Sequence, residues 1–90
     1  MANDRSPTQE SLNDILLDLR SCQDEITIAR AKRVTIDSAP MLARIDSLAN
    51  RGHALWPQGE EHRGPAFEDI LRVKADIQNL AVECRRALSS

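Results

Sequence analysis

Two cysteines are the first side chains in this sequence that could in principle do nucleophilic or metal chemistry. Cys22 and Cys84 stand 62 positions apart, a separation that matches neither a zinc motif nor the dense cysteine spacing of a disulfide framework. Both fall on apolar positions of expected helices, where a free cysteine behaves as a small buried hydrophobe rather than as an activated thiol. We therefore expect both thiols to be inert.

Two histidines and two neighbouring glutamates form the other group with chemical potential. Glu60, Glu61 and His62 lie in a polar stretch, and His53 lies shortly before it. Imidazole and carboxylate groups bind metal ions and transfer protons. Their spacing matches no ligand motif, and the glycines and proline around them indicate a solvated loop over residues 57–64. We interpret them as loop charges, with no metal site.

The motifs that would indicate an enzyme are missing from the sequence. There is no Gly-rich phosphate loop, no nucleophile elbow and no carboxylate pair set in a plausible pocket. A chain of 90 residues also buries only a small core, which leaves little room for a pocket. The sequence therefore predicts a protein that is not an enzyme, with no catalytic residues and no cofactor.

Basic side chains cluster near the ends of expected helices, where positive charge complements the helix dipole. The alternative use of such a cluster is nucleic-acid binding, by a small dimeric regulator. A net charge of -2 and a pI near 5.6 provide no global positive field, which counts against nucleic acid as a partner. The clusters are Arg30, Lys32 and Arg33, with Arg44 and Arg51 as further members, and Arg85 with Arg86.

Apolar residues at helical spacing predict the elements that position these groups. Ser6 and Pro7 form an N-terminal signal, and the apolar residues that follow alternate steps of three and four over a helix at 7–34. Pro40 suits the first turn of a second helix at 38–55, and a third helix follows at 65–88. The expected seams are Leu12, Ile15, Leu19, Cys22, Ile26 and Ala29; Met41, Ile45, Leu48 and Leu55; and Ala66, Ile70, Val73, Ile77, Leu80, Cys84 and Ala87.

These patterns predict an all-α fold. We expect a three-helix bundle, or a long helical hairpin with a shorter middle helix, with coiled-coil-like packing in a single domain over 1–90. Aromatic residues make up only 2% of the chain, so its core relies on aliphatic side chains, which suit helix packing. The sequence has neither a signal peptide nor an apolar run long enough for a membrane span. A cytoplasmic protein without a membrane partner is therefore expected.

A second set of apolar residues lies away from the seams, on the outer sides of the first and third helices. Because contiguous exposed apolar surface often marks an interface, we predict a protein interface at Leu17, Ile28, Leu71 and Val82. Trp56 joins this set as a possible anchor, since Trp is frequent at binding hot spots. The competing interpretation is that Trp56 closes the end of its own core together with Phe67.

The sequence-level hypothesis for function follows from this surface. We expect a small helical module that binds another protein, itself or both, as an adaptor, chaperone, inhibitor or assembly subunit. A mismatch between two long helices and one short helix would leave part of each seam open, and this favours a homo-oligomer. The alternatives are the nucleic-acid-binding regulator that uses Arg30, Lys32 and Arg33, and a non-catalytic subunit of an enzyme complex.

Overall fold

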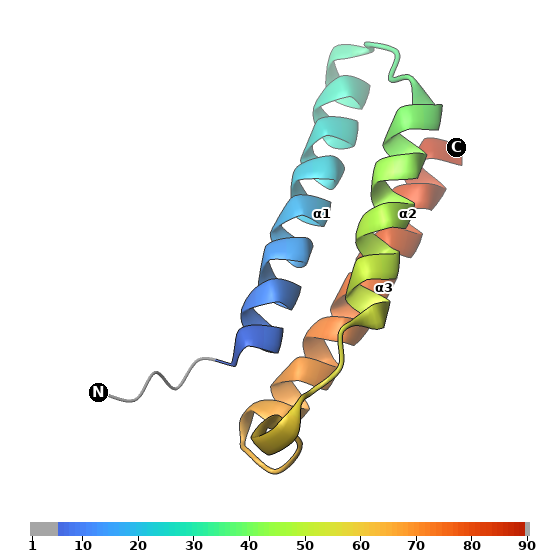
Figure 1. The fold of residues 1–90 in the computed structure, drawn as a ribbon. Coiled ribbons are helices and arrows are strands. Elements are labelled where there is room, and N and C mark those ends of the chain that lie inside the picture. The colour runs from blue at the N-terminus through green and yellow to red at the C-terminus, as the bar shows by residue number, and fades with distance from the viewer. Residues whose placement is uncertain (1–5, 90) are drawn as a thin grey trace.

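The computed structural model describes residues 6–89, which form a three-helix bundle. Its helices are α1 (Pro7–Lys32), α2 (Ser38–Ala54) and α3 (Ala66–Ser89), and a short 3-10 helix, η1 (Gly59–His62), precedes α3. The chain runs up through α1, down through α2 and up again through α3, so α1 and α3 are parallel (Figure 1). The three predicted helices are confirmed, with ends within two residues of the expected bounds.

Both ends of α1 follow from local backbone chemistry. At the start, the Ser6 hydroxyl accepts a hydrogen bond from the backbone N–H of Gln9, and Pro7 occupies the first helical position. At the end, Arg33 adopts a left-handed conformation with φ 58°, and its N–H reaches the carbonyls of Ala29 and Arg30. The helix therefore stops at a cap that uses arginine where glycine is usual.

Gly52 lies inside α2, and side chains of both other helices pack close to its backbone. A Cβ at this position would lie 3.1 Å from Ile77 Cγ2 on α3 and 3.8 Å from Ile15 Cγ2 on α1. Since glycine lacks that atom, the backbone of α2 can sit directly against both neighbours. The glycine costs about 1 kcal/mol in helix propensity, and its missing Cβ permits this close packing near the end of α2.

The segment between α2 and α3 covers the seam that the shorter α2 leaves uncovered. Pro57 is buried, and Glu61 of η1 accepts hydrogen bonds from the hydroxyls of Ser6 and Thr8 at the start of α1. This segment therefore covers part of the seam beyond the end of α2, while the seam residues Val73 and Leu80 stay partly exposed. Residues 57–64 are not simply a solvated loop, because this segment closes the lower end of the bundle in Figure 1.

The core confirms the predicted seam of α1 and corrects that of α3. Leu12, Leu19 and Cys22 are all fully buried. On α3 the buried stripe instead shifts toward α2, because α3 packs against both other helices; Val73, Leu80 and Ala87 are only partly buried. The buried residues of α3 are Ile70, Lys74, Ile77, Ala81 and Cys84. None of the helices formed by residues 6–89 combines the length and hydropathy required to cross a bilayer.

Candidate protein interface

The five residues predicted to form an interface are all solvent-exposed. Leu17 is 60% exposed, Ile28 53% and Trp56 51%, and Val82 and Leu71 are about 40% exposed. Val34, which follows α1, is exposed to a similar degree as Leu17. Sequence reasoning did not select Val34, because its β-branched side chain was interpreted as a helix stop signal rather than as surface.

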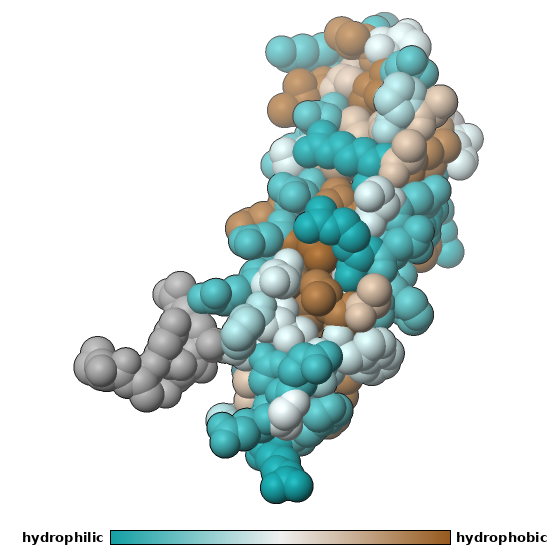
Figure 2. All heavy atoms as spheres, in the orientation of Figure 1, coloured by the Kyte–Doolittle hydropathy of each residue, from teal (hydrophilic) through white to brown (hydrophobic). Residues whose placement is uncertain are grey.

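These exposed residues divide between two sides of the bundle. Leu17 and Ile28 lie on the outer side of α1, opposite its buried stripe, and are separated by about 16 Å along the helix axis. Leu71 and Val82 lie on α3, while Trp56 follows the end of α2. On the face drawn in Figure 2, hydrophobic side chains form separate patches among hydrophilic ones. The five residues therefore do not form one continuous surface.

Trp56 is the best-positioned of the exposed side chains. The ammonium Nζ of Lys74 lies 4.1 Å from the centroid of its ring, within the range of a cation–π interaction. The ring of His53 meets it edge-on at 6.5 Å between centroids. Leu71 precedes Lys74 by one helical turn on α3. Trp56 is thus held in place while half of its surface stays open to a partner, and it does not close the core.

Lys74 fixes this corner by capping the end of α2. Its ammonium donates hydrogen bonds to the carbonyls of Gly52 and His53, each at 2.9 Å, and to that of Leu55. These are carbonyls that a helix C-terminus leaves without intrahelical partners. Burial lowers the pKa of Lys74 from its ordinary value, because the charged form loses hydration. The sequence offered no signal for this role, since one lysine among apolar residues resembles any surface lysine.

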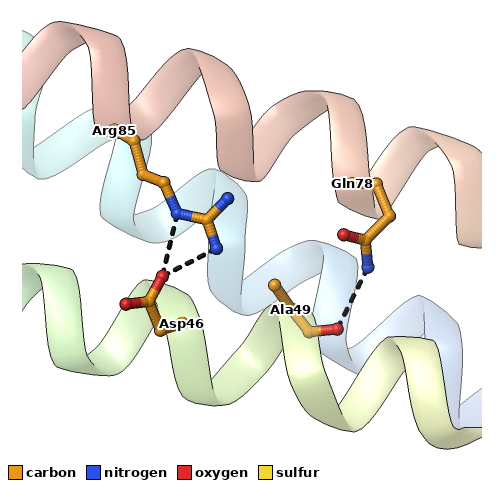
Figure 3. Close-up of polar contacts among 4 residues, drawn as sticks. All are labelled: Asp46, Ala49, Gln78 and Arg85. Carbon is orange, nitrogen blue, oxygen red and sulfur yellow. Dashed lines mark hydrogen bonds and ion pairs between the residues drawn. The ribbon is translucent and has the colours of Figure 1, made fainter.

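Two further polar contacts continue along the α2–α3 seam (Figure 3). Gln78 donates a hydrogen bond from Nε2 to the carbonyl of Ala49 at 3.0 Å. Arg85 makes an ion pair with Asp46, with Nη2 and Oδ1 2.7 Å apart. Both partners of this ion pair keep more than a third of their side-chain surface exposed, so water screens it. Lys74, Gln78 and Arg85 together form the polar ladder between α2 and α3.

Val82 borders an open cleft on α3. The cleft measures about 350 Å³ and is lined by Val82, Arg85, Arg86 and Ser89, all from one side of the helix. A second cleft of about 270 Å³ lies between α1 and α2, where Ile15, Leu55 and Arg51 contribute to its lining. Both are shallow surface features whose size suits a side chain of a partner.

Glu61 and His62 of the polar stretch make structural contacts. Glu61 accepts from the backbone N–H of Gln58 at 2.7 Å and from Thr8 Oγ1 at 2.8 Å. The Gln58 amide, followed by the Thr8 contacts, lowers the pKa of Glu61. His62 packs against Phe67, with 5.9 Å between ring centroids, so Phe67 and Trp56 pair with different histidines. Within residues 6–89 no three His, Cys, Asp or Glu side chains converge to hold a metal ion.

Both thiols lie in the apolar core between α1 and α3. Cys22 and Cys84 are at most 1% exposed, and Cys84 Sγ lies 4.0 Å from the carbonyl oxygen of Leu19. Burial is the main cause that raises the pKa of both thiols. A raised thiol pKa disfavours the thiolate, which is the reactive form.

The up-down-up path brings the two basic clusters to the same end of the bundle. Arg30, Lys32 and Arg33 end α1, and Arg86 lies in the last turn of the parallel α3. Arg44, near the start of α2, makes an ion pair with Glu25 at 3.6 Å. Arg85 is also paired, as described above, and Arg51 lies in the last turn of the antiparallel α2. The basic end therefore contains fewer available cations than the sequence clusters suggest.

Comparisons with known proteins do not assign this chain to a family. No protein-family model matches the chain, and neither a curated protein nor a solved structure is significantly similar to it. Its function has to be inferred from its own surface.

Proposed function

We propose that this chain is a small cytoplasmic, non-enzymatic helical module that binds another protein along the side of its bundle. The observation that carries the proposal is the placement of Trp56. A half-exposed tryptophan positioned by Lys74 and His53 loses little side-chain entropy on binding, and Trp residues of this kind dominate many interfaces. Leu71 and Val82 extend the same α3 side of the bundle and complete what we call the Trp56 face.

The dimensions of the bundle favour its sides over its ends as the surface that binds a partner. The molecule measures 49 by 23 by 17 Å. An end of 23 by 17 Å offers roughly 300 Å², whereas each partner in a stable protein complex buries about 800 Å². A side of 49 by 23 Å offers roughly 1,000 Å² and therefore suffices. An adaptor, chaperone, inhibitor or assembly subunit would all use such a side, as would a non-catalytic subunit of an enzyme.

The test combines cross-linking in the source cells with a matched pair of variants. A photo-reactive amino acid at position 71, on the Trp56 face, should capture a specific partner that the same group at the exposed position of Asn79 does not. The affinity of that partner is then measured by calorimetry for Leu71→Asp and for Asn79→Asp. We expect a loss of at least about tenfold for Leu71→Asp, because a charge would be buried in an apolar contact. Equal affinities for the two variants would contradict the proposal.

A nucleic-acid-binding regulator is the second candidate, and the gathering of Arg30, Lys32, Arg33 and Arg86 at one end supports it. The area counts against it, because a single DNA-binding module buries about 600 to 1,000 Å² of protein surface and this end offers roughly a third to a half of that. Salt distinguishes the two candidates. Nucleic-acid binding should weaken steeply between 50 and 200 mM salt, roughly tenfold or more for a few phosphate contacts, whereas an apolar interface should not.

A further inference from the structure

Cys22 and Cys84 form a pair of core side chains that the proposed protein interface does not use. Both are free thiols, at most 1% exposed, and both lie in the apolar seam between α1 and α3. Burial shields them from large reagents, but it does not separate them from each other. Their chemistry therefore depends on whether the two helices hold them at the same level.

The register of α1 and α3 places the two cysteines in one layer of the bundle. Ile15 and Ile77 lie at one level, because their side chains come within 3.8 Å and 3.1 Å of the Cβ position of Gly52. Cys22 follows Ile15 by seven residues, and Cys84 follows Ile77 by the same number. Because α1 and α3 are parallel (Figure 1), both steps rise by about 10 Å, or two turns, in the same direction. The two thiols therefore share a layer.

A contact between the two helices agrees with this level. Sγ of Cys84 lies 4.0 Å from the carbonyl oxygen of Leu19, which precedes Cys22 by about one turn of α1. Side chains of a helix tilt toward its N-terminus, which brings the thiol of Cys22 toward that same turn. After burial, Cys22 is the next cause that raises the pKa of Cys84, since two thiolates at short distance repel.

We propose that Cys22 and Cys84 form a reversible disulfide, which makes the bundle a redox switch of its own stability. Packed helices have axes about 8 to 10 Å apart and Cα atoms about 2.3 Å from each axis, so Cα atoms of one layer approach to about 4 to 7 Å. A disulfide requires about 4.4 to 6.8 Å. The bond joins α1 to α3 and closes a loop that contains all of α2 and η1. It stabilises the fold chiefly because it restricts the unfolded chain.

The oxidant is a small disulfide, for which oxidised glutathione is the probe. Cys84 lies five residues before the end of α3, where local opening costs least. Its thiolate attacks one sulfur of oxidised glutathione, whose S–S bond breaks, and one reduced glutathione leaves. The thiolate of Cys22 then attacks the sulfur of Cys84 and releases the second glutathione. The two cysteines lose two electrons and two protons, and the two glutathione molecules gain them.

Burial also sets when this reaction occurs. The raised pKa of both thiols keeps the thiolate fraction small, so exchange is slow at neutral pH and becomes faster as the pH rises. In a reducing compartment both thiols stay reduced, and the disulfide accumulates when oxidised glutathione does.

Oxidation of the folded full chain tests the proposal. The chain is incubated with millimolar oxidised glutathione at about pH 8, and its mass and melting temperature are then measured. We expect a monomer that has lost two hydrogens, carries no glutathione and melts at least about 10 °C above the reduced chain. Excess dithiothreitol should restore the original mass and melting temperature.

The control moves one thiol out of the layer. Ser21→Cys combined with Cys22→Ala keeps two thiols but shifts one by about 100° around α1, to an exposed position. This variant should gain glutathione at position 21 instead of closing an internal disulfide. Its melting temperature should change by less than about 2 °C on oxidation.

Four outcomes would overturn the proposal. The first two are thiols of the folded parent that stay free and thiols that gain glutathione only. The third is a disulfide that forms only when the chain refolds from urea in the same buffer, because a switch has to close in the folded protein. The fourth is an internal disulfide that forms equally well in the control variant or that does not raise the melting temperature of the parent, because the two thiols would then not share a layer.

Discussion

The two seams that α3 forms with its neighbours differ in chemistry. Against α1, α3 packs almost entirely through apolar side chains such as Ile70 and Leu12, both fully buried. Against α2 it adds the polar ladder of Lys74, Gln78 and Arg85. Apolar packing is non-directional and contributes most of the stability, whereas hydrogen bonds tolerate little displacement. The comparison teaches that apolar packing stabilises both seams, whereas the polar ladder also sets where α2 lies along α3.

The largest expected effect is the loss of apolar packing in the α1–α3 seam. Leu19→Ala or Ile77→Ala should lower the free energy of unfolding by about 2 to 5 kcal/mol, because both residues are fully buried and the cavity cannot collapse completely. Urea unfolding followed by Trp56 fluorescence measures the loss. Leu17→Ala, an exposed leucine on the same helix, is the control and should change stability by less than about 0.5 kcal/mol. Equal losses at positions 17 and 19 would show that the seam is misassigned.

The next largest loss of stability is expected when Lys74 of the polar ladder is replaced. Lys74→Met keeps the apolar stem but leaves the carbonyls of Gly52, His53 and Leu55 without their donor, at an expected cost of about 1 to 3 kcal/mol. Trp56 emission should also change, since its ring loses the ammonium beside it. Urea unfolding and emission spectra check both, with the exposed Lys32→Met as the control. Unchanged stability and emission would show that Lys74 does not cap the end of α2.

The cap that links η1 to α1 should respond to acid. The pKa of Glu61 is lowered in the folded state. Its carboxylate therefore contributes fully to the stability of the fold above the unfolded pKa of about 4.5, and this contribution is lost as the pH falls through the lower folded pKa. Glu61→Gln removes that carboxylate. The difference in melting temperature between parent and variant should therefore be constant at pH 5–7 and shrink below pH 4.5. A difference that does not vary with pH would show that the charge of Glu61 is irrelevant to the cap.

The smallest expected effect on stability comes from the exposed ion pair between Arg85 and Asp46 at the end of the polar ladder. A double-mutant cycle with Arg85→Ala and Asp46→Ala should give a coupling of about 0.2 to 1 kcal/mol, since both side chains remain largely in water. The coupling should decrease in 1 M salt, where the Debye length is about 3 Å. A coupling as large as the loss for Lys74→Met would mean that exposed and buried polar contacts position α2 equally.

The periodic spacing of Leu12, Ile15, Leu19, Cys22 and Ile26 was sufficient to predict a helix and its buried side, because α1 packs through one stripe. The three-helix fold and its approximate bounds followed from the same kind of pattern, with Pro7 and Pro40 near two of the starts. The exposure of Leu17, Ile28, Leu71 and Val82 was predictable for the complementary reason, since they fall outside the periodic stripes. What those residues bind stays a prediction.

Other features were decided only when the helices came together. α3 contacts two helices at once, so its buried stripe is shifted from the predicted seam toward α2 and includes Lys74, which a periodic pattern treats as surface. Glu61 lies 53 residues from Thr8, and no local rule connects a loop carboxylate to a helix start at that separation. Trp56 lies on the surface beside the ammonium of Lys74, another distant partner. Propensity and periodicity act over a few residues, and these contacts depend on which side chains the folded chain brings within hydrogen-bonding distance.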